Sequence, residues 1–271
     1  MARIVIIQHQ KEASRCHGYS LQMLINRWKE AGHRIAVMAV TEDLQDADLA
    51  IMHVNLSHVP QACAEVARKR YPRVVNIGAL DIRKRNVSRN LLARDDDWPG
   101  PVIAKSDFNC GGVPEWVSWK RAKNMGHETG APPVRFLDYA VYRRLDLVPE
   151  EAWSIPEVVV ERFLPERVPK GFCLRTWIFF GDHERCRRFL SPKALVKGAD
   201  YLGFQCSEVP EFLRAERERL GFEYGKFDFV MHEGKAILLD ANKTPGIPPE
   251  PLTKLRDAYA NLAGGLDAML K

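Results

Sequence analysis

Hydrophobic and polar positions divide the chain into two parts with different patterns. In the first hundred residues, short apolar runs alternate with amphipathic stretches, which indicates a small parallel α/β layer. Leu21, Leu24, Ile25 and Trp28 recur at three- and four-residue spacing before Gly32, so they predict a helix with one buried face. The predicted elements are strands over 4–7, 35–40, 49–54 and 74–77 and helices over 21–31 and 60–70.

The pattern changes after residue 98, where an acidic run meets the turn signal Pro99-Gly100. From residue 101 onward, apolar strands are joined by hairpins, which predicts an antiparallel sheet with helices, an α+β arrangement. Strands are predicted over 102–105, 158–163, 173–180, 227–231 and 236–242. We expect three domains, over 1–98, 99–165 and 166–271.

Composition narrows the class of protein. The 271 residues are 46% hydrophobic and 28% charged, and no apolar run approaches the ~20 residues of a membrane span. The apolar run at the start is too short for a signal peptide and is expected to be a strand. A net charge of +5 from interleaved residues does not support nucleic-acid binding, but it suits a pocket for polyphosphates and carboxylates. Six well-separated cysteines without a C-x-x-C pair indicate reduced thiols in the cytoplasm.

The segment from residue 227 to residue 246 carries the strongest chemical signal, because it predicts a hairpin with acidic residues on one face. Strand alternation places Asp240 and Asn242 together, and a three-residue turn would pair Asp228 directly with Asp240. A two-residue turn would instead place Leu239 opposite Asp228. Opposed aspartates repel, and a hard cation such as Mg²⁺ accepts carboxylate and amide oxygens as ligands. The alternative is a surface hairpin whose polar face meets water.

Three other segments have candidate roles. Lys105 ends a strand before Gly111 and Gly112, so an ammonium and backbone N–H groups could meet a polyphosphate there. The apolar strand that turns polar at Glu161 could offer a backbone donor and acceptor to an adenine ring. Arg175 lies in an apolar strand and needs either an internal carboxylate or an anionic ligand. For the first segment, the alternative is an ordinary surface lysine followed by an ordinary turn. For the second, it is a plain buried strand.

The order of these features resembles the ATP-grasp superfamily: a strand, lysine and glycine loop, an apolar strand with Glu, a strand with Arg, then Asp and, twelve residues later, Asp-x-Asn. The resemblance covers roughly Asp81 to Gly246 and is to the part shared by glutathione synthetases, D-alanine:D-alanine ligases and ribosomal-protein glutamate ligases. It implies that residues 1–98 form a pre-grasp-like α/β layer. A two-lobed ATP-grasp domain with antiparallel sheets would follow, with its small lobe over 99–165 and its C-terminal lobe with the metal site over 166–271.

The resemblance also implies roles for matching positions. Lys105 would contact the α- and β-phosphates of ATP and its adenine side, and Lys84 would be an earlier nucleotide-binding lysine, for which Arg85 is a near competitor. Arg175 would stabilise the transferring phosphoryl group. Lys193 is a candidate to lie over the γ-phosphate or the carboxylate, with an exposed loop lysine as the alternative. Two Mg²⁺ ions, or Mn²⁺ in their place, would bind the following residues: Asp228, Asp240 and Asn242. The remaining nucleotide contacts would be Asn109, Gly111 and Gly112 in a phosphate lid, Glu161, Phe163 and Leu164 at the adenine, and Glu166 at the ribose.

Two features depart from the superfamily pattern. Glu is usual where Asp240 stands, which shortens one metal ligand by a methylene group. The segment over 113–157 is longer than usual, and its aromatic residues are expected to pack in a core, with substrate contact as the alternative.

The implied activity is that of an ATP-dependent ligase. ATP would phosphorylate a carboxylate, and an amine or thiol would then attack the acyl phosphate, giving ADP and phosphate. The expected partners are a small carboxylate and an acceptor that can belong to a peptide; nucleic acid and membrane are not expected, and self-association is left open. Two alternatives are a small-molecule kinase with a base such as Asp107 and a non-catalytic nucleotide-binding module. Cys110 could suggest covalent catalysis, but no His is placed by the sequence to activate it.

Overall fold

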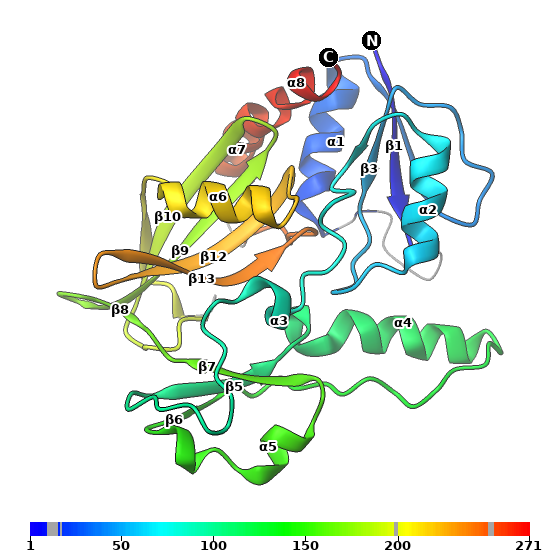
Figure 1. Cartoon of the computed structure of the whole chain (residues 1–271). Coiled ribbons are helices and arrows are strands. Elements are labelled where there is room, and N and C mark those ends of the chain that lie inside the picture. The colour runs from blue at the N-terminus through cyan, green and yellow to red at the C-terminus, as the bar shows by residue number, and fades with distance from the viewer. Residues whose placement is uncertain (10–15, 17, 198–199, 249–251) are drawn as a thin grey trace.

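The computed structural model describes residues 1–9, 16, 18–197, 200–248 and 252–271. Its first layer consists of β1 (Arg3–Gln8), α1 (Ser20–Glu30), β2 (Arg34–Ala39), β3 (Leu49–Met52), α2 (Gln61–Arg70) and β4 (Val74–Val75). The sheet is parallel, as predicted, with the strand order β2-β1-β3-β4. Helices cover both faces (Figure 1), so β1 is apolar on both sides: Ile4 and Ile6 pack on the α1 side, and Val5 and Ile7 pack on the α2 side.

A second, three-stranded antiparallel sheet has the order β6-β5-β7. The elements of this part are α3 (Lys84–Val87), β5 (Val102–Ser106), the 3₁₀ turn η1 (Asn109–Gly112), α4 (Val113–Asn124), β6 (Ala140–Tyr142), the 3₁₀ turn η2 (Leu145–Leu147), α5 (Glu150–Ser154) and β7 (Val158–Arg162). α4 extends away from this sheet, beneath the first layer (Figure 1). The long segment over 113–157 therefore contributes α4, the edge strand β6, and the stretch of η2 and α5 that covers the small sheet. The core between this cover and the sheet includes Val102, Val148 and Val160.

The third sheet has six antiparallel strands in the order β11-β10-β9-β12-β13, with β8 also paired to β9. The elements are β8 (Glu166–Val168), β9 (Gly171–Phe180), β10 (His183–Ser191), β11 (Gly203–Cys206), α6 (Glu211–Arg219), β12 (Tyr224–His232), β13 (Lys235–Asn242), α7 (Leu252–Gly264) and α8 (Leu266–Met269). Trp177, Phe179, Phe227 and Phe229 form a core beneath Leu213 of α6. On the opposite face of β9, Leu174 borders a cavity shared with the small sheet, and Ile178 and Phe180 pack in the core formed with α1 and α7.

The α/β plus α+β fold class is confirmed. One sheet falls within each of the three ranges expected to be domains, although α7 returns to pack against the first layer through Leu255 and Tyr259. The division into three domains remains a prediction. Within the described ranges, no helix has the length and apolar character needed to cross a membrane.

The hairpin of β12 and β13 reaches its predicted pairing by a different route. His232 pairs with Lys235, so the turn has two residues, and both Glu233 (φ 49°) and Gly234 (φ 76°) adopt the positive φ of a type I′ turn. A regular ladder from that turn would place Leu239 opposite Asp228. A β-bulge between Asp228 and Phe229 takes up Leu239 as the extra residue, and Asp228 pairs with Asp240.

Candidate active site

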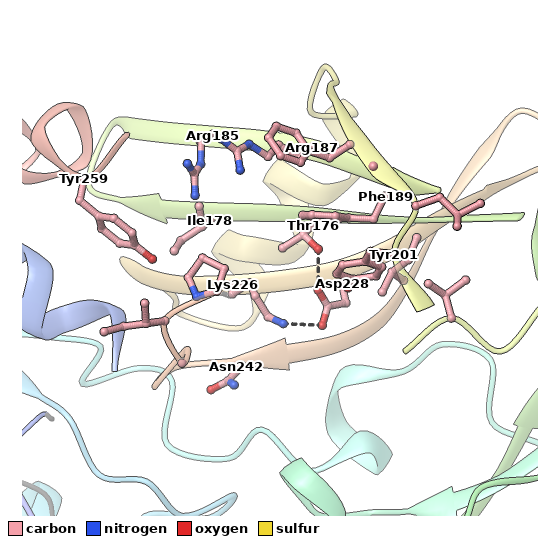
Figure 2. A pocket seen from close by; sticks show the side chains of 18 of the residues that line it. Thr176, Ile178, Arg185, Arg187, Phe189, Tyr201, Lys226, Asp228, Asn242 and Tyr259 are labelled. Carbon is pink, nitrogen blue, oxygen red and sulfur yellow. Dashed lines mark hydrogen bonds and ion pairs between the residues drawn. The ribbon is translucent and has the colours of Figure 1, made fainter. Parts of the chain in front are cut away.

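Two opposed carboxylates form the centre of the site, and each lies beside a lysine. Thr176 Oγ1 donates a hydrogen bond to Asp228 Oδ1 (3.1 Å), and Lys226 Nζ donates to Asp228 Oδ2 (2.7 Å; Figure 2). On the paired strand, Asp240 Oδ1 lies 3.2 Å from Lys84 Nζ. The two ammonium groups offset the repulsion that the opposed aspartates would otherwise exert on the hairpin.

The two lysines remain charged in spite of their burial. Burial is the largest single influence and would lower the pKa of Lys84, but the charge and hydrogen-bonding capacity of Asp240, together with Tyr139 and Glu161, hold that pKa above its ordinary value. Burial likewise opposes the charge of Lys226, and Asp228 raises the pKa of that lysine above its usual range. Both side chains are therefore ammonium ions at neutral pH.

The donor set suits a hard divalent cation. Asp228 and Asp240 supply carboxylates from adjacent strands, and Asn242 follows Asp240 on the same face. Asp240 Oδ1 is buried and accepts no well-aligned hydrogen bond among the described residues. A buried carboxylate oxygen in this state is suited to bind a divalent cation. Asn242 Oδ1 accepts hydrogen bonds from Thr244 N (2.8 Å) and, at 3.4 Å, from Thr244 Oγ1, which also donates to Asn55 Oδ1 (2.9 Å). The ammonium groups of Lys84 and Lys226 lie beside these two carboxylates, which shows that this position favours positive charge.

The candidate metal site needs the amide oxygen of Asn242 as its third ligand. Within the described parts of the chain, no three His, Cys, Asp or Glu side chains gather as a metal site. The residues therefore fit Mg²⁺ only as two carboxylates with an amide oxygen, a hard set that suits Mg²⁺.

A cavity of about 200 Å³ lies between the small sheet and the six-stranded sheet and is called here the smaller cavity. Its walls include seven of the residues that the sequence singled out: Lys84, Lys105, Glu161, Phe163, Leu164, Asp228 and Asp240. Apolar side chains line much of the rest, and Tyr139 of the long 113–157 segment also contributes. Lys105 Nζ lies 2.8 Å from Glu161 Oε2 and donates to Leu239 O, the carbonyl of the bulge (3.1 Å).

The backbone at the end of β7 offers one donor to this cavity. Phe163 N–H donates to Pro101 O (2.9 Å) and is thus occupied within the protein. Leu164 N–H has no acceptor among the described residues, and Leu164 lines the smaller cavity. An apolar slot with one backbone donor is the kind of surface that an adenine ring needs.

A cavity of about 800 Å³, called here the larger cavity, adjoins the smaller one. Leu174, Val196 and Asp228 line both, so the carboxylate pair stands at their junction. Asn242 and Lys226 also line the larger cavity, as do aromatic side chains and two arginines of β10 (Figure 2). The arrangement joins a slot for a flat apolar group, a cation site and a separate compartment.

Arg175 and Glu166 lie away from both cavities. Arg175 Nε and Nη2 donate to Glu166 Oε2 (2.9 Å) and Oε1 (2.6 Å), and Met231 N–H donates to Glu166 Oε2 (2.7 Å). Alternation along β9 explains the placement: Leu174 and Thr176 line the larger cavity, so Arg175 points to the other face of the sheet. Of the two partners considered for Arg175, the structure gives it the internal carboxylate, and the phosphoryl and ribose roles expected of this pair are not supported.

Lys193 and the glycine turn are also displaced from the expected positions. Lys193 is 67% exposed and pairs with Asp200 (2.7 Å), outside both cavities. Asn109 is buried, and its N–H donates to Ser57 Oγ (2.8 Å). Gly111 and Gly112 are packed against residues 134–137, where a Cβ would stand within 2.8 Å and 2.7 Å of backbone oxygens. The close packing of these glycines explains why neither lines a cavity. Cys110, which directly precedes them, does line the larger cavity.

The two neighbouring basic residues before β5 have different surroundings. Lys84 lines the smaller cavity, whereas Arg85 Nε pairs with Asp107 Oδ2 (2.5 Å). Asp107, the base considered for a kinase, is 1% exposed and lines neither cavity. Its carboxylate is therefore committed to a structural pair.

Sequence reasoning placed Lys226 in the candidate hairpin but gave it no role, and it did not consider Arg185 and Arg187 as cavity residues. All three line the larger cavity, and the two arginines come from β10, a strand that was not predicted. The available signal was period two: Arg185, Arg187 and Phe189 alternate with Glu184, Cys186 and Arg188 in register opposite β9.

The sequence matches no protein-family profile and no curated protein sequence. Solved structures, however, show the same fold over nearly the whole length of both chains. The D-cycloserine synthetase DcsG is similar with a TM-score of 0.58 and 12% identity, over 99% of this chain and 100% of that one. The D-alanine–D-alanine ligase from Bacillus anthracis is similar with a TM-score of 0.53 and 14% identity, over 100% and 97%.

A third similar structure is the ATP-grasp ligase PsnB, complexed with a phosphomimetic variant of its minimal precursor, Mg and ADP. Its TM-score is 0.58 and its identity 13%, over 99% of this chain and 98% of that one. These structures are ligases of the ATP-grasp superfamily, and the chain has the ATP-grasp fold. The resemblance seen in the order of motifs is thereby confirmed for the fold.

Proposed function

We propose that this protein is an ATP-dependent ligase that activates a carboxylate as an acyl phosphate and joins it to an amine or thiol, with release of ADP. One observation carries the proposal: the pair Asp228 and Asp240, each with a lysine, stands at the junction of an apolar slot and a large compartment. Such a junction is where a γ-phosphate and a second substrate would meet. Similarity to ligases, one of them bound to Mg and ADP, supports the proposal.

In this proposal the nucleotide occupies the smaller cavity. The adenine lies among its apolar side chains and accepts a hydrogen bond from Leu164 N–H. Lys105 and Lys84 bind the phosphates, since both side chains line this cavity. The triphosphate then runs toward Asp228, so its γ-phosphate reaches the larger cavity.

The chemistry needs positioning and neutralisation of charge rather than a nucleophilic side chain. Bound by Asp228, Asp240 and Asn242, Mg²⁺ would neutralise the phosphate oxygens and fix their orientation. Thr176 holds the Asp228 carboxylate in place through its hydroxyl. Lys226 takes the part first expected of Arg175, that of stabilising the transferring phosphoryl group, because its ammonium lies beside Asp228 in the larger cavity.

The proposed reaction has two steps. A carboxylate oxygen of the acyl donor attacks the γ-phosphorus, the bond from this phosphorus to the bridging oxygen breaks, and ADP leaves. The amine or thiol then attacks the acyl carbon, loses a proton, and displaces inorganic phosphate. The larger cavity holds the donor and admits the acceptor.

The two alternatives find less support. A kinase would need a base beside the acceptor hydroxyl, and the candidate Asp107 is tied to Arg85 away from both cavities. A module that only binds nucleotide would have no use for a compartment of about 800 Å³ beyond the phosphates.

Hydroxylamine provides a direct test, because it attacks acyl phosphates to give hydroxamates. A panel of carboxylates is incubated with ATP, Mg²⁺ and hydroxylamine, and ADP, phosphate and hydroxamate are measured, with D228N as the inactive control. We expect equal amounts of ADP and hydroxamate from at least one carboxylate. A stable phosphoester would favour a kinase instead, and failure to bind Mg-ATP by calorimetry would reject ligase and kinase alike.

A further inference from the structure

One face of the six-stranded sheet carries two cross-strand rows of different character. The polar row is paired in register across β13, β12 and β9 and consists of Asp240, Asp228 and Thr176. A second row, called here the apolar row, is paired in register across β9, β10 and β11 and consists of Leu174, Phe189 and Phe204. All three residues of the apolar row line the larger cavity.

The apolar row lies beside the carboxylate pair. Leu174 and Thr176 are two residues apart on β9 and both line the larger cavity, so the two rows are neighbours on the same face of the sheet. Two residues of a strand span roughly 7 Å. A substrate whose carboxylate lies at Asp228 would therefore reach the apolar row with a group that is only a few carbon atoms away.

Tyr201 connects the two rows. Its ring is stacked on that of Phe189, with centroids 4.4 Å apart and planes inclined by 20°. Figure 2 shows Tyr201 beside Asp228. Burial raises the pKa of Tyr201, and the negative charge of Asp228 raises it further, so the phenol is neutral at pH 7. Uncharged rings therefore lead from the carboxylate pair to the apolar row.

The rings at this end are not fully covered by other side chains. Phe204 is 39% exposed, and Leu202 is largely exposed, although both line the larger cavity. The rings of Phe189 and Phe204 are inclined by 52°, with centroids 5.9 Å apart, so neither covers the face of the other. Arg187 Cζ lies 4.0 Å from the centroid of Phe204, and this packing holds the ring in place. Uncovered apolar surface that borders a polar centre is typical of ligand sites.

We infer that the acyl donor is a carboxylate with an aromatic group: the carboxylate is activated at Asp228, and the aromatic group lies against Phe189, Tyr201 and Phe204. The cavity of about 800 Å³ has room for such a group beside the phosphates, whereas a short aliphatic acid would leave most of it empty. The inference rests on the proposed ligase function, because it names the substrate class of that same site. It gives the three aromatic residues a specificity-determining role.

Three carboxylates test the aromatic group. Propanoate has the carboxylate alone, 3-phenylpropanoate adds a flat ring, and 3-cyclohexylpropanoate adds a puckered ring of similar size. Their affinities are measured by calorimetry in the presence of Mg²⁺ and a non-hydrolysable ATP analogue. We expect 3-phenylpropanoate to bind about tenfold or more tightly than propanoate, the effect of burying a ring. It should bind about threefold or more tightly than 3-cyclohexylpropanoate, because only a flat ring stacks on aromatic side chains.

Variants locate the contact. F204A should reduce the preference for 3-phenylpropanoate over propanoate to about threefold or less, and F204Y should retain the preference because the ring remains. F212A is the matched control: Phe212 of α6 is 41% exposed, close to the exposure of Phe204, but it lines neither cavity. Its preference should equal that of the wild type. Melting temperatures check that every variant is folded.

Any of four results would overturn the inference: no preference for 3-phenylpropanoate over propanoate in the wild type, equal binding of the phenyl and cyclohexyl probes, no binding of the phenyl probe while the ATP analogue binds, or equal losses of preference in F204A and F212A. Failure of the ligase proposal is a separate outcome, namely absence of hydroxamate from every carboxylate. The two failures are distinguishable, because the preference for a ring is measured by binding without turnover.

Discussion

Replacing Asp240 by Asn removes the nearest anion from an ammonium that has almost no access to water. The side chain of Lys84 is 3% exposed and that of Asp240 is 26% exposed, and the two charges lie 3.2 Å apart. The other hydrogen-bond acceptor of Lys84 Nζ is Phe108 O (3.1 Å), a neutral carbonyl. Breaking a buried ion pair from one side costs about 3–5 kcal/mol, and the partial exposure of Asp240 favours the lower end, about 3 kcal/mol.

A double-mutant cycle measures the pair directly. The free energy of unfolding is determined in urea at pH 7.5, without divalent cations, for the wild type, D240N, K84M and K84M/D240N. The double variant removes both charges and should recover at least half of the loss, so the coupling free energy should be about 2 kcal/mol. K193M is the control, because Lys193 forms an exposed pair with Asp200 that contributes under about 1 kcal/mol. A coupling below about 0.5 kcal/mol would refute the reasoning.

Three more predictions concern the nucleotide, the metal end and the effect of pH. D228A should lower ADP release by about a hundredfold or more, because both charge neutralisation and positioning are lost; unchanged turnover would reject the metal assignment. K105A should weaken ATP binding by roughly 10–100-fold, the loss of a charge-assisted contact, and an unaltered calorimetric dissociation constant would remove Lys105 from the site. Burial lowers the pKa of His53 from 6.5 to about 3, and neither ring nitrogen has a hydrogen-bond partner in the described structure. Below pH 6.5, His53 is therefore protonated in the unfolded state and neutral in the folded state. The free energy of unfolding should fall by about 1.4 kcal/mol per pH unit as pH decreases from 6.5 toward 3. Urea unfolding at pH 7.5 and pH 5.5 should show a smaller loss in H53Q than in the wild type, and equal losses would contradict the assignment.

The hairpin shows how a correct expectation can depend on structure that the pattern does not contain. The spacing of Asp228 and Asp240 suggested their pairing through a three-residue turn. The actual turn has two residues, and the bulge at Leu239 restores the pairing and presents a carbonyl to Lys105. A bulge depends on how a strand bends against its neighbours, and local alternation cannot reveal it.

Arg175 and β10 illustrate the opposite case. For these strands, the sequence did not show which face borders a cavity. Alternation correctly grouped Arg175 with Trp177, but it could not say which face of β9 meets the cavity. β10 was overlooked because one face carries arginines toward the larger cavity and the other carries Glu184 and Arg188, so it lacks a continuous apolar face.

Local pattern and motif order in the sequence were enough to predict the class of fold and most of the strands, and they singled out Lys84, Lys105, Asp228, Asp240 and Asn242, which all line one or both cavities. These features follow from side-chain alternation and from chemistry carried within short segments. Tertiary structure alone decided which face of the six-stranded sheet borders the cavities, and hence that Arg185, Arg187 and Lys226 line the larger cavity while Arg175 does not. The reason is physical: a strand has two equivalent faces until other elements pack against one of them.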